Sequence, residues 1–181
     1  MTTPPVTPRR ILVYGVTGSG KSTAAARIAT AFEVPLILAD EVAWQPGWKM
    51  LGLEQQRKTF ADLAGGDCWV FDTAYGTWLD LVLPRVDFVV ALDYPRWVSL
   101  QRLLRRTAAR IVTRAPVCNG NTESVRMALS RDSILLWHFR SFARKRRRII
   151  AWSSDLTGPT VHRFRKPADL ERWIRSQPAS R

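Results

Sequence analysis

The sequence contains few residues of several reactive types, and each scarcity narrows what the protein can be. Its only two cysteines, Cys68 and Cys118, fit no zinc spacing, so we expect reduced thiols and a cytoplasmic location. Its two histidines, His138 and His162, lie in no nucleophile or metal-ligand pattern, and we interpret both as structural. Apolar runs fall short of the roughly 20 residues of a membrane span. Residues 1–8 lack the apolar core of a signal peptide, so we expect a disordered lead-in.

Acidic residues are also scarce, and their shortage is confined to one half of the chain. The 181 residues include 28 Lys and Arg but only 15 Asp and Glu, which gives a net charge of +13. Residues 1–95 carry 8 basic and 10 acidic side chains, a net charge of −2. Residues 96–181 carry 20 basic and 5 acidic side chains, a net charge of +15. This distribution predicts a phosphate-rich partner for the second half, either a small molecule or nucleic acid.

Residues 15–23, GVTGSGKST, match the phosphate-binding loop pattern G-x-x-x-x-G-K-[ST]. An apolar segment of strand length precedes the loop at 10–14, and an Ala-rich, helix-favouring segment follows at 22–32. Lys21 is expected to reach the β- and γ-phosphates, and the Ser22 hydroxyl to ligate Mg²⁺. The candidate nucleotide-binding residues are Gly15, Thr17, Gly18, Ser19, Gly20, Lys21, Ser22 and Thr23.

Strand-like and helix-like segments alternate along the rest of the chain. Such alternation predicts an α/β fold with a parallel sheet and helices on both faces, here a single unit over 9–177. The expected strands are 10–14, 34–39, 68–71, 88–92 and 160–164. The expected helices are 22–32, 53–64, 76–83, 95–114, 123–152 with a break near Ser130, and 167–176.

Three expected strands end in an aspartate, at the sheet edge where α/β proteins bind ligands. Asp93, followed by a Tyr-Pro pair, is interpreted as a helix cap. Asp40 and Asp72 are interpreted as functional, because we expect their strands to flank the strand of the phosphate loop. Asp72 would support Mg²⁺, and Asp40 would accept a proton from an acceptor hydroxyl. Trp44 and Trp48 would either form a platform for the acceptor or pack a flap, about 41–64, onto the core.

Two groups of basic residues account for much of the positive charge. Arg102, Arg106 and Arg110 are spaced to share one helix face, where like charges repel unless an anion binds them. Arginine suits bidentate phosphate contact, although a solvated helix face is the alternative. The consecutive run Arg144–Arg148 wraps around its helix, so we expect most of it to be solvated, with nucleic-acid binding left open.

Several segments together resemble a known group of proteins. They are 15–23, Asp40 with 44–48, 69–75, 92–97, 120–124, 140–148 and 167–173. Through them, residues 9–175 resemble the adenylate-kinase-like small P-loop kinases, and more closely the bacterial topology-modulation or FlaR-like group. The resemblance implies a five-stranded parallel sheet of the nucleotide-kinase type and a mobile helical lid near 107–130. Lid arginines such as Arg102, Arg106 and Arg114 would close on ATP.

One departure from adenylate kinases concerns the acceptor. Those enzymes carry Gly-Phe-Pro-Arg after the third strand, whose arginine grips the acceptor phosphate, whereas this chain has Asp-Thr-Ala-Tyr-Gly at 72–76. The difference favours a hydroxyl acceptor. The candidate acceptor-binding residues are Asp40, Trp44, Trp48, Asp72 and Tyr75, and the candidate catalytic residues are Lys21, Asp40, Arg102 and Arg106.

We therefore expect an ATP- or GTP-dependent, Mg²⁺-dependent kinase that moves the γ-phosphate to a small molecule, with a hydroxyl such as that of a metabolite, nucleoside or antibiotic as acceptor. A nucleoside-monophosphate kinase is the alternative within enzymes. A nucleic-acid-binding regulator that uses Arg144–Arg148 and a P-loop switch is the alternative of another class. No membrane partner is expected, and the oligomeric state stays open.

Overall fold

A computed structural model describes residues 9–128, 130 and 133–177 of the chain. The predicted lead-in, residues 1–8, lies outside the described residues. Five strands form one sheet in the order β2-β5-β1-β6-β7, and each neighbouring pair is parallel. This topology confirms the predicted fold class. The strands of the sheet are β1 (Arg10–Gly15), β2 (Leu36–Ile37), β5 (Trp69–Phe71), β6 (Phe88–Leu92) and β7 (Thr160–Phe164).

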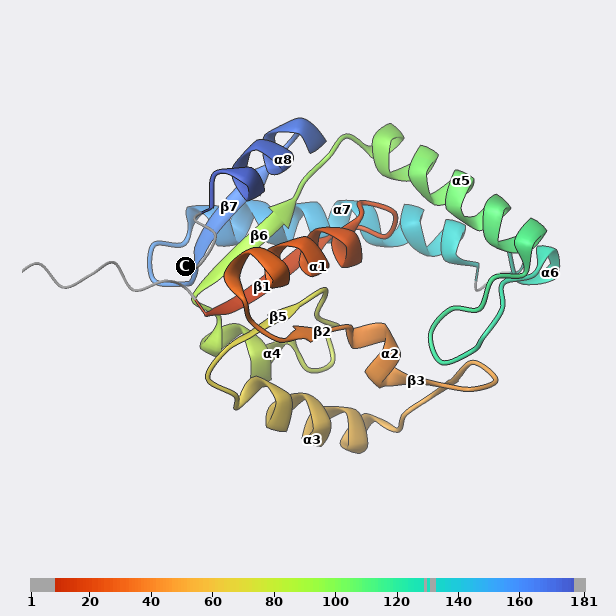
Figure 1. Ribbon diagram of the computed structural model, residues 1–181, viewed down its shortest axis with the longest axis horizontal. Coiled ribbons are helices and arrows are strands. Elements are labelled where there is room, and N and C mark those ends of the chain that lie inside the picture. Colours follow the sequence, from red (N-terminus) through yellow and green to blue (C-terminus); the bar gives the residue numbers. More distant parts are fainter. Residues whose placement is uncertain (1–8, 129, 131–132, 178–181) are drawn as a thin grey trace, which may run out of the picture.

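Helices cover both faces of this sheet (Figure 1). One face packs against α1 and α8, and the other packs against α2, α3, α4 and α7. The strands therefore lie between two apolar layers, which explains why β1 and β6 are almost entirely buried and read as continuous apolar runs. The helical elements are α1 (Lys21–Phe32), α2 (Ala39–Ala43), α3 (Leu53–Ala64), α4 (Leu79–Val82), η1 (Leu83–Arg85), α5 (Arg96–Thr113), α6 (Val125–Ala128), α7 (Ile134–Ser154) and α8 (Pro167–Arg175).

The structure corrects the expected place of Asp40. The predicted strand 34–39 is reduced to β2, and Asp40 lies in the first turn of α2 rather than at a strand end. β2 also does not flank β1, because β5 lies between them and β6 lies on the other side of β1. Asp40 therefore reaches the sheet edge from a neighbouring helix.

Two further local features concern the flap and the lid. Residues 44–50 form a small antiparallel hairpin of β3 (Trp44–Gln45) and β4 (Lys49–Met50), which the sequence analysis did not predict. The helical region expected over 123–152 with a break near Ser130 is formed by α6 and α7, which are separated at that break as predicted.

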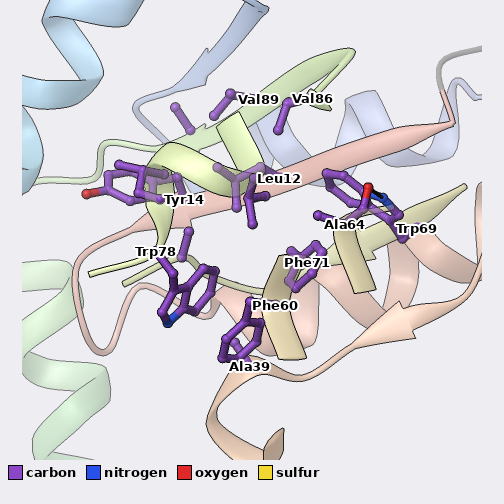
Figure 2. Packing of buried hydrophobic residues seen from close by; sticks show 14 of the residues in the cluster. Leu12, Tyr14, Ala39, Phe60, Ala64, Trp69, Phe71, Trp78, Val86 and Val89 are labelled. Carbon is purple, nitrogen blue, oxygen red and sulfur yellow. Dashed lines mark hydrogen bonds between the residues drawn. The ribbon is translucent and has the colours of Figure 1, made fainter. Parts of the chain in front are cut away.

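Aromatic side chains fill the layer between the sheet and α3 (Figure 2). Phe60 of α3 stacks on Trp78 with their ring centroids 3.8 Å apart, and both side chains are fully buried. Phe71 of β5 lies 6.1 Å from Phe60, centroid to centroid, so the helix, the strand and the segment before α4 share one aromatic cluster. The residue after Phe71 is Asp72, so this cluster also fixes the polar edge of the sheet.

Removing the central ring should destabilise the protein without touching the polar edge. We expect Phe60→Ala to lower the free energy of unfolding by about 3–5 kcal/mol, because it leaves a cavity among rings that cannot collapse. Urea unfolding measures this change. Leu53→Ala on the same helix, at a side chain that is 51% exposed, is the control and should cost less than about 1 kcal/mol. Equal losses for the two variants would contradict the packing described.

Candidate active site

The phosphate loop is held against α5 by an approach that only glycine allows. Gly18 has φ +82°, and a Cβ added there would lie 2.4 Å from the carbonyl oxygen of Ser99 and 2.8 Å from the Cβ of Leu103. Gly20, at the N-cap of α1, has φ +89°. These two positions explain why the loop needs glycine: one lets α5 pack against it, and the other turns the chain into the helix whose N-terminus favours anions.

Lys21, Ser22 and Asp72 meet at the start of α1. Ser22 Oγ donates a hydrogen bond of 2.6 Å to Asp72 Oδ2, and the backbone N–H of Ala39 donates one of 2.9 Å to Asp72 Oδ1. Lys21 Nζ donates to the carbonyl oxygen of Val16 at 3.2 Å. Burial raises the pKa of Asp72 and lowers the pKa of Lys21. The negative charge of Asp72 partly restores the pKa of Lys21, and the positive charge of Lys21 partly restores the pKa of Asp72.

Asp40 belongs to a second polar group beside the first. The hydroxyl of Tyr75 donates a short hydrogen bond to Asp40 Oδ1, and Trp44 Nε1 donates to the Tyr75 oxygen at 3.3 Å. Burial, followed by the negative charge of Asp40, raises the pKa of Tyr75 far above its ordinary value, so the phenol stays protonated and remains a donor. Asp40 is itself exposed to solvent, so its carboxylate is accessible to a ligand.

The predicted arginine face points to the same region. Arg102 donates to the carbonyl oxygen of Ser19 at 3.2 Å, and Arg110 forms an ion pair of 2.8 Å with Glu123. Arg106 lies between them on α5; its partial loss of hydration, followed by the charge of Arg110, lowers its pKa. Asp40 and Glu123 act on Arg106 in the opposite direction, which places its charge near the second polar group.

The β3–β4 hairpin of the flap and the loop of the lid approach each other (Figure 1), and side-chain amides join them. Asn119 Nδ2 donates to the carbonyl oxygens of Glu41 and Trp44, both at 2.7 Å. Asn121 Oδ1 accepts from the backbone N–H of Trp48 at 2.8 Å, and Asn121 Nδ2 donates to the Gln45 carbonyl at 3.0 Å. Two loops far apart in the sequence thus meet above Asp40.

The two flap tryptophans take part in packing and hydrogen bonding. Trp44 and Trp48 meet edge to face with their ring centroids 5.7 Å apart. Trp48 Nε1 donates to the carbonyl oxygen of Thr122 at 3.1 Å. The two tryptophans were expected either to form a platform for the acceptor or to pack the flap, and these contacts favour packing of the flap. Trp44 also donates a hydrogen bond to the Tyr75 hydroxyl.

The basic run 144–148 is divided between solvent and the protein: Arg144, Arg146 and Arg147 are exposed, as expected for most of the run, whereas Lys145 and Arg148 are half-buried. Lys145 Nζ donates to the Gly15 carbonyl oxygen at 3.1 Å, and Arg148 donates to the Tyr14 hydroxyl at 3.2 Å. Arg146 pairs with Asp93 at 3.4 Å. Asp93 also binds Arg163 and is structural, although it forms ion pairs rather than a helix cap.

His138 also contacts the phosphate loop, a role that no motif in the sequence indicated. It is fully buried on α7, and its Nδ1 lies 3.0 Å from the Thr17 carbonyl oxygen. Burial lowers the pKa of His138, so the ring is neutral, and Nδ1 must carry the proton to donate to that oxygen. His162, by contrast, packs among Phe88 and Trp173 and is structural, as predicted.

Among the described residues, no group of three or more His, Cys, Asp or Glu side chains could hold a metal ion by itself. Cys68 and Cys118 are free thiols. None of the helices in the described part of the chain is both long and apolar enough to cross a membrane.

Comparison with solved structures shows that this is the fold of small P-loop kinases. The chain is similar to a gluconokinase from Sinorhizobium meliloti 1021, with 18% identity, a TM-score of 0.52 and coverage of 93% of this chain and 88% of that chain. It is similar to a shikimate kinase from Acinetobacter baumannii in complex with shikimate, with 14% identity, a TM-score of 0.59 and coverage of 93% and 90%. A sugar kinase from Janibacter sp. HTCC2649 gives 19% identity, a TM-score of 0.50 and coverage of 93% and 94%. Comparisons of the sequence with family models and with curated proteins give no match.

The close approach of Gly18 to α5 can be tested with a matched glycine. Gly47 has a similar φ of +78°, but a Cβ there would meet nothing within 4 Å. Both Gly18→Ala and Gly47→Ala should pay about 1–2 kcal/mol for a left-handed alanine. Only Gly18→Ala should also push the loop away from α5 and weaken ATP binding at least 10-fold by calorimetry. Undiminished ATP affinity in Gly18→Ala would contradict this account of the loop.

Proposed function

We propose that the protein is a kinase that transfers the γ-phosphate of ATP or GTP to a hydroxyl of a small molecule. The observation that carries the proposal is the juxtaposition of the Asp40–Tyr75 pair with Lys21 of the phosphate loop. Asp72 accepts from Ser22, the residue after Lys21, and from the N–H of Ala39, the residue before Asp40. A carboxylate suited to accept a proton therefore lies near the residue suited to hold the transferring phosphate. The solved structures of similar fold, a gluconokinase, a shikimate kinase and a sugar kinase, support a hydroxyl acceptor.

Each residue of the site has a distinct part in this mechanism. The backbone N–H groups of 18–22 and the Lys21 ammonium bind the donor phosphates. The Tyr75 hydroxyl fixes the orientation of Asp40, whose carboxylate accepts the proton of the acceptor hydroxyl as its oxygen attacks phosphorus. Arg102 and Arg106 place positive charge beside the phosphoryl group in transit, where it stabilises the transition state.

The oxygen ligands present suit Mg²⁺. Ser22 and Asp72 supply a hydroxyl and a carboxylate, and Mg²⁺ in kinases is bound through one or two such groups together with phosphate oxygens and water. We propose that Ser22 holds the ion and that Asp72 supports it; when bound, the ion neutralises charge on the β- and γ-phosphates. The absence of a richer acidic cluster among the described residues is consistent with this arrangement.

The role of Asp40 has a direct test. Asp40→Asn should reduce kcat by roughly 10²-fold or more and leave the KM for ATP near its wild-type value, because only the proton acceptor is removed. A coupled assay of ADP release over hydroxylated metabolites, nucleosides and nucleoside monophosphates supplies the measurement. Glu41→Gln removes the same charge one residue away and should retain activity. An unchanged rate in Asp40→Asn would remove Asp40 from the role of base.

The phosphate loop is tested separately. Lys21→Ala should abolish phosphoryl transfer to every acceptor in the same assay, because the main positive charge on the donor phosphates is lost. Full activity without Lys21 would refute the kinase. Transfer confined to nucleoside monophosphates would instead favour the nucleotide-kinase alternative.

A further inference from the structure

Two basic side chains of α7 reach the polar edge of the sheet on the face that also carries α2 and Asp40. Lys145 and Arg148 are spaced i and i+3, so both project from one side of the helix. Lys145 lies over the ring of Tyr14 at 5.3 Å from its centroid, and Arg148 donates to the hydroxyl of the same tyrosine. Tyr14 is the residue before the phosphate loop, so α7 brings two cations to the boundary of the donor site.

These cations lie on the acceptor face of the sheet. The side chain of Tyr14 packs in the same cluster as Ala39, Ala43 and Ala74, which neighbour Asp40, Trp44 and Tyr75 in the sequence. α1 packs on the other face. Residues 18–22 and the arginines of α5 are assigned to the donor phosphates, whereas Arg148 contacts Tyr14, whose side chain packs in the cluster next to the acceptor residues.

The positive charge of this group is not balanced by the protein. Among the described residues, neither Lys145 nor Arg148 forms an ion pair with a carboxylate. Burial, followed by the charge of Lys21, lowers the pKa of Lys145 to about 7, and Arg144 and Arg148 act in the same direction. Asp40 opposes them without restoring the ordinary value. An anion bound here would relieve this repulsion.

We propose that the acceptor carries an anionic group, a carboxylate or a phosphate ester, that binds Lys145 and Arg148 while its hydroxyl faces Asp40. This inference rests on the proposed function and names the chemical class of its acceptor. Arg148 offers a planar pair of donors that suits either oxyanion, and the buried Tyr14 hydroxyl, which accepts from Arg148, helps to position the guanidinium.

The first test measures binding rather than turnover. With ADP and Mg²⁺ saturating, calorimetry would titrate gluconate, quinate, glycerol 3-phosphate, glucose 6-phosphate and inorganic phosphate, with neutral glucitol and glycerol as references. At least one of the anions should bind, and neither neutral compound should. Comparing the carboxylates with the phosphates shows which kind of anionic group the site prefers. Binding of neither class would overturn the proposal.

A matched pair of variants ties that binding to α7. Arg147 is exposed and forms no hydrogen bond or ion pair with the described residues, so Arg147→Gln removes the same charge one position away. Arg148→Gln should weaken anion binding at least 10-fold and raise the acceptor KM with the KM for ATP within about 2-fold. If the two variants weaken anion binding equally, Arg148 acts only through general electrostatic attraction, and the proposal is overturned.

Proton uptake gives an independent readout of Lys145. The groups that face this amine are Lys21, Asp40, Tyr14, Arg144 and Arg148. Since its pKa in the free protein is about 7, Lys145 is mostly neutral at pH 8 and must gain a proton to pair with an anion. Titrations at pH 8 in two buffers of different ionisation enthalpy should therefore show proton uptake that Lys145→Met abolishes. Anion binding with no proton uptake would contradict the role of Lys145.

The outcomes separate this inference from the proposed function. Transfer to neutral and anionic acceptors alike, with Arg148→Gln unchanged, would overturn the anionic acceptor and leave the kinase intact. Anion binding that depends on Arg148, without phosphoryl transfer to any bound compound, would support the subsite and count against the kinase.

Discussion

The buried carboxylate of Asp72 joins the two halves of the site. One of its oxygens accepts from Ser22 at the start of α1, and the other accepts from the backbone N–H of Ala39 at the start of α2. The residue after Ala39 is Asp40. Burying a carboxylate is costly unless it is hydrogen-bonded, and Asp72 is only 2% exposed, so both bonds are strongly favoured. Asp72 thereby fixes the distance between the donor loop and the proposed base, and the aromatic cluster behind β5 holds Asp72 itself.

Part of the excess positive charge in the second half of the chain lies around the phosphate loop. α5 brings arginines to the phosphate loop from one side, and α7 brings Lys145 and Arg148 from the other. Burial, followed by the repulsion of the neighbouring cations, lowers the pKa of Lys145. The fold tolerates the repulsion between these cations because buried apolar side chains anchor α5 and α7, namely Leu103, Phe142 and Ile149. We propose that this site is preorganised for an anion, which supplies the missing negative charge when it binds.

The features that the sequence predicted well are those determined by neighbouring residues. A phosphate loop requires glycines, Lys21 and Ser22 within nine positions, and a doubly covered strand is an apolar run wherever it lies in the sheet. The order of the strands depends on contacts between distant segments, and for this reason the expectation that β2 flanks β1 was wrong. Likewise, the contacts of Asn119 and Asn121 with the flap join segments more than seventy residues apart, and no local pattern marks them.

The basic run on α7 is different, because a local signal was present. His138, Phe142, Ile149 and Trp152 recur at helical spacing and form the stripe that faces the sheet, and Lys145 falls in the same stripe. A charged residue on the buried stripe of a helix needs a polar partner, so its position marks it as part of a site. The run is consecutive in sequence, but each residue of a helix faces a different direction. The position of Lys145 on the buried stripe therefore does not show when the run is taken as one block of positive charge. Arg144, Arg146 and Arg147 stay exposed, whereas Lys145 contacts the Gly15 carbonyl oxygen and Arg148 the Tyr14 hydroxyl. Two of the five cations of the run thus lie toward the edge of the sheet, where we propose that the anionic group of the acceptor binds.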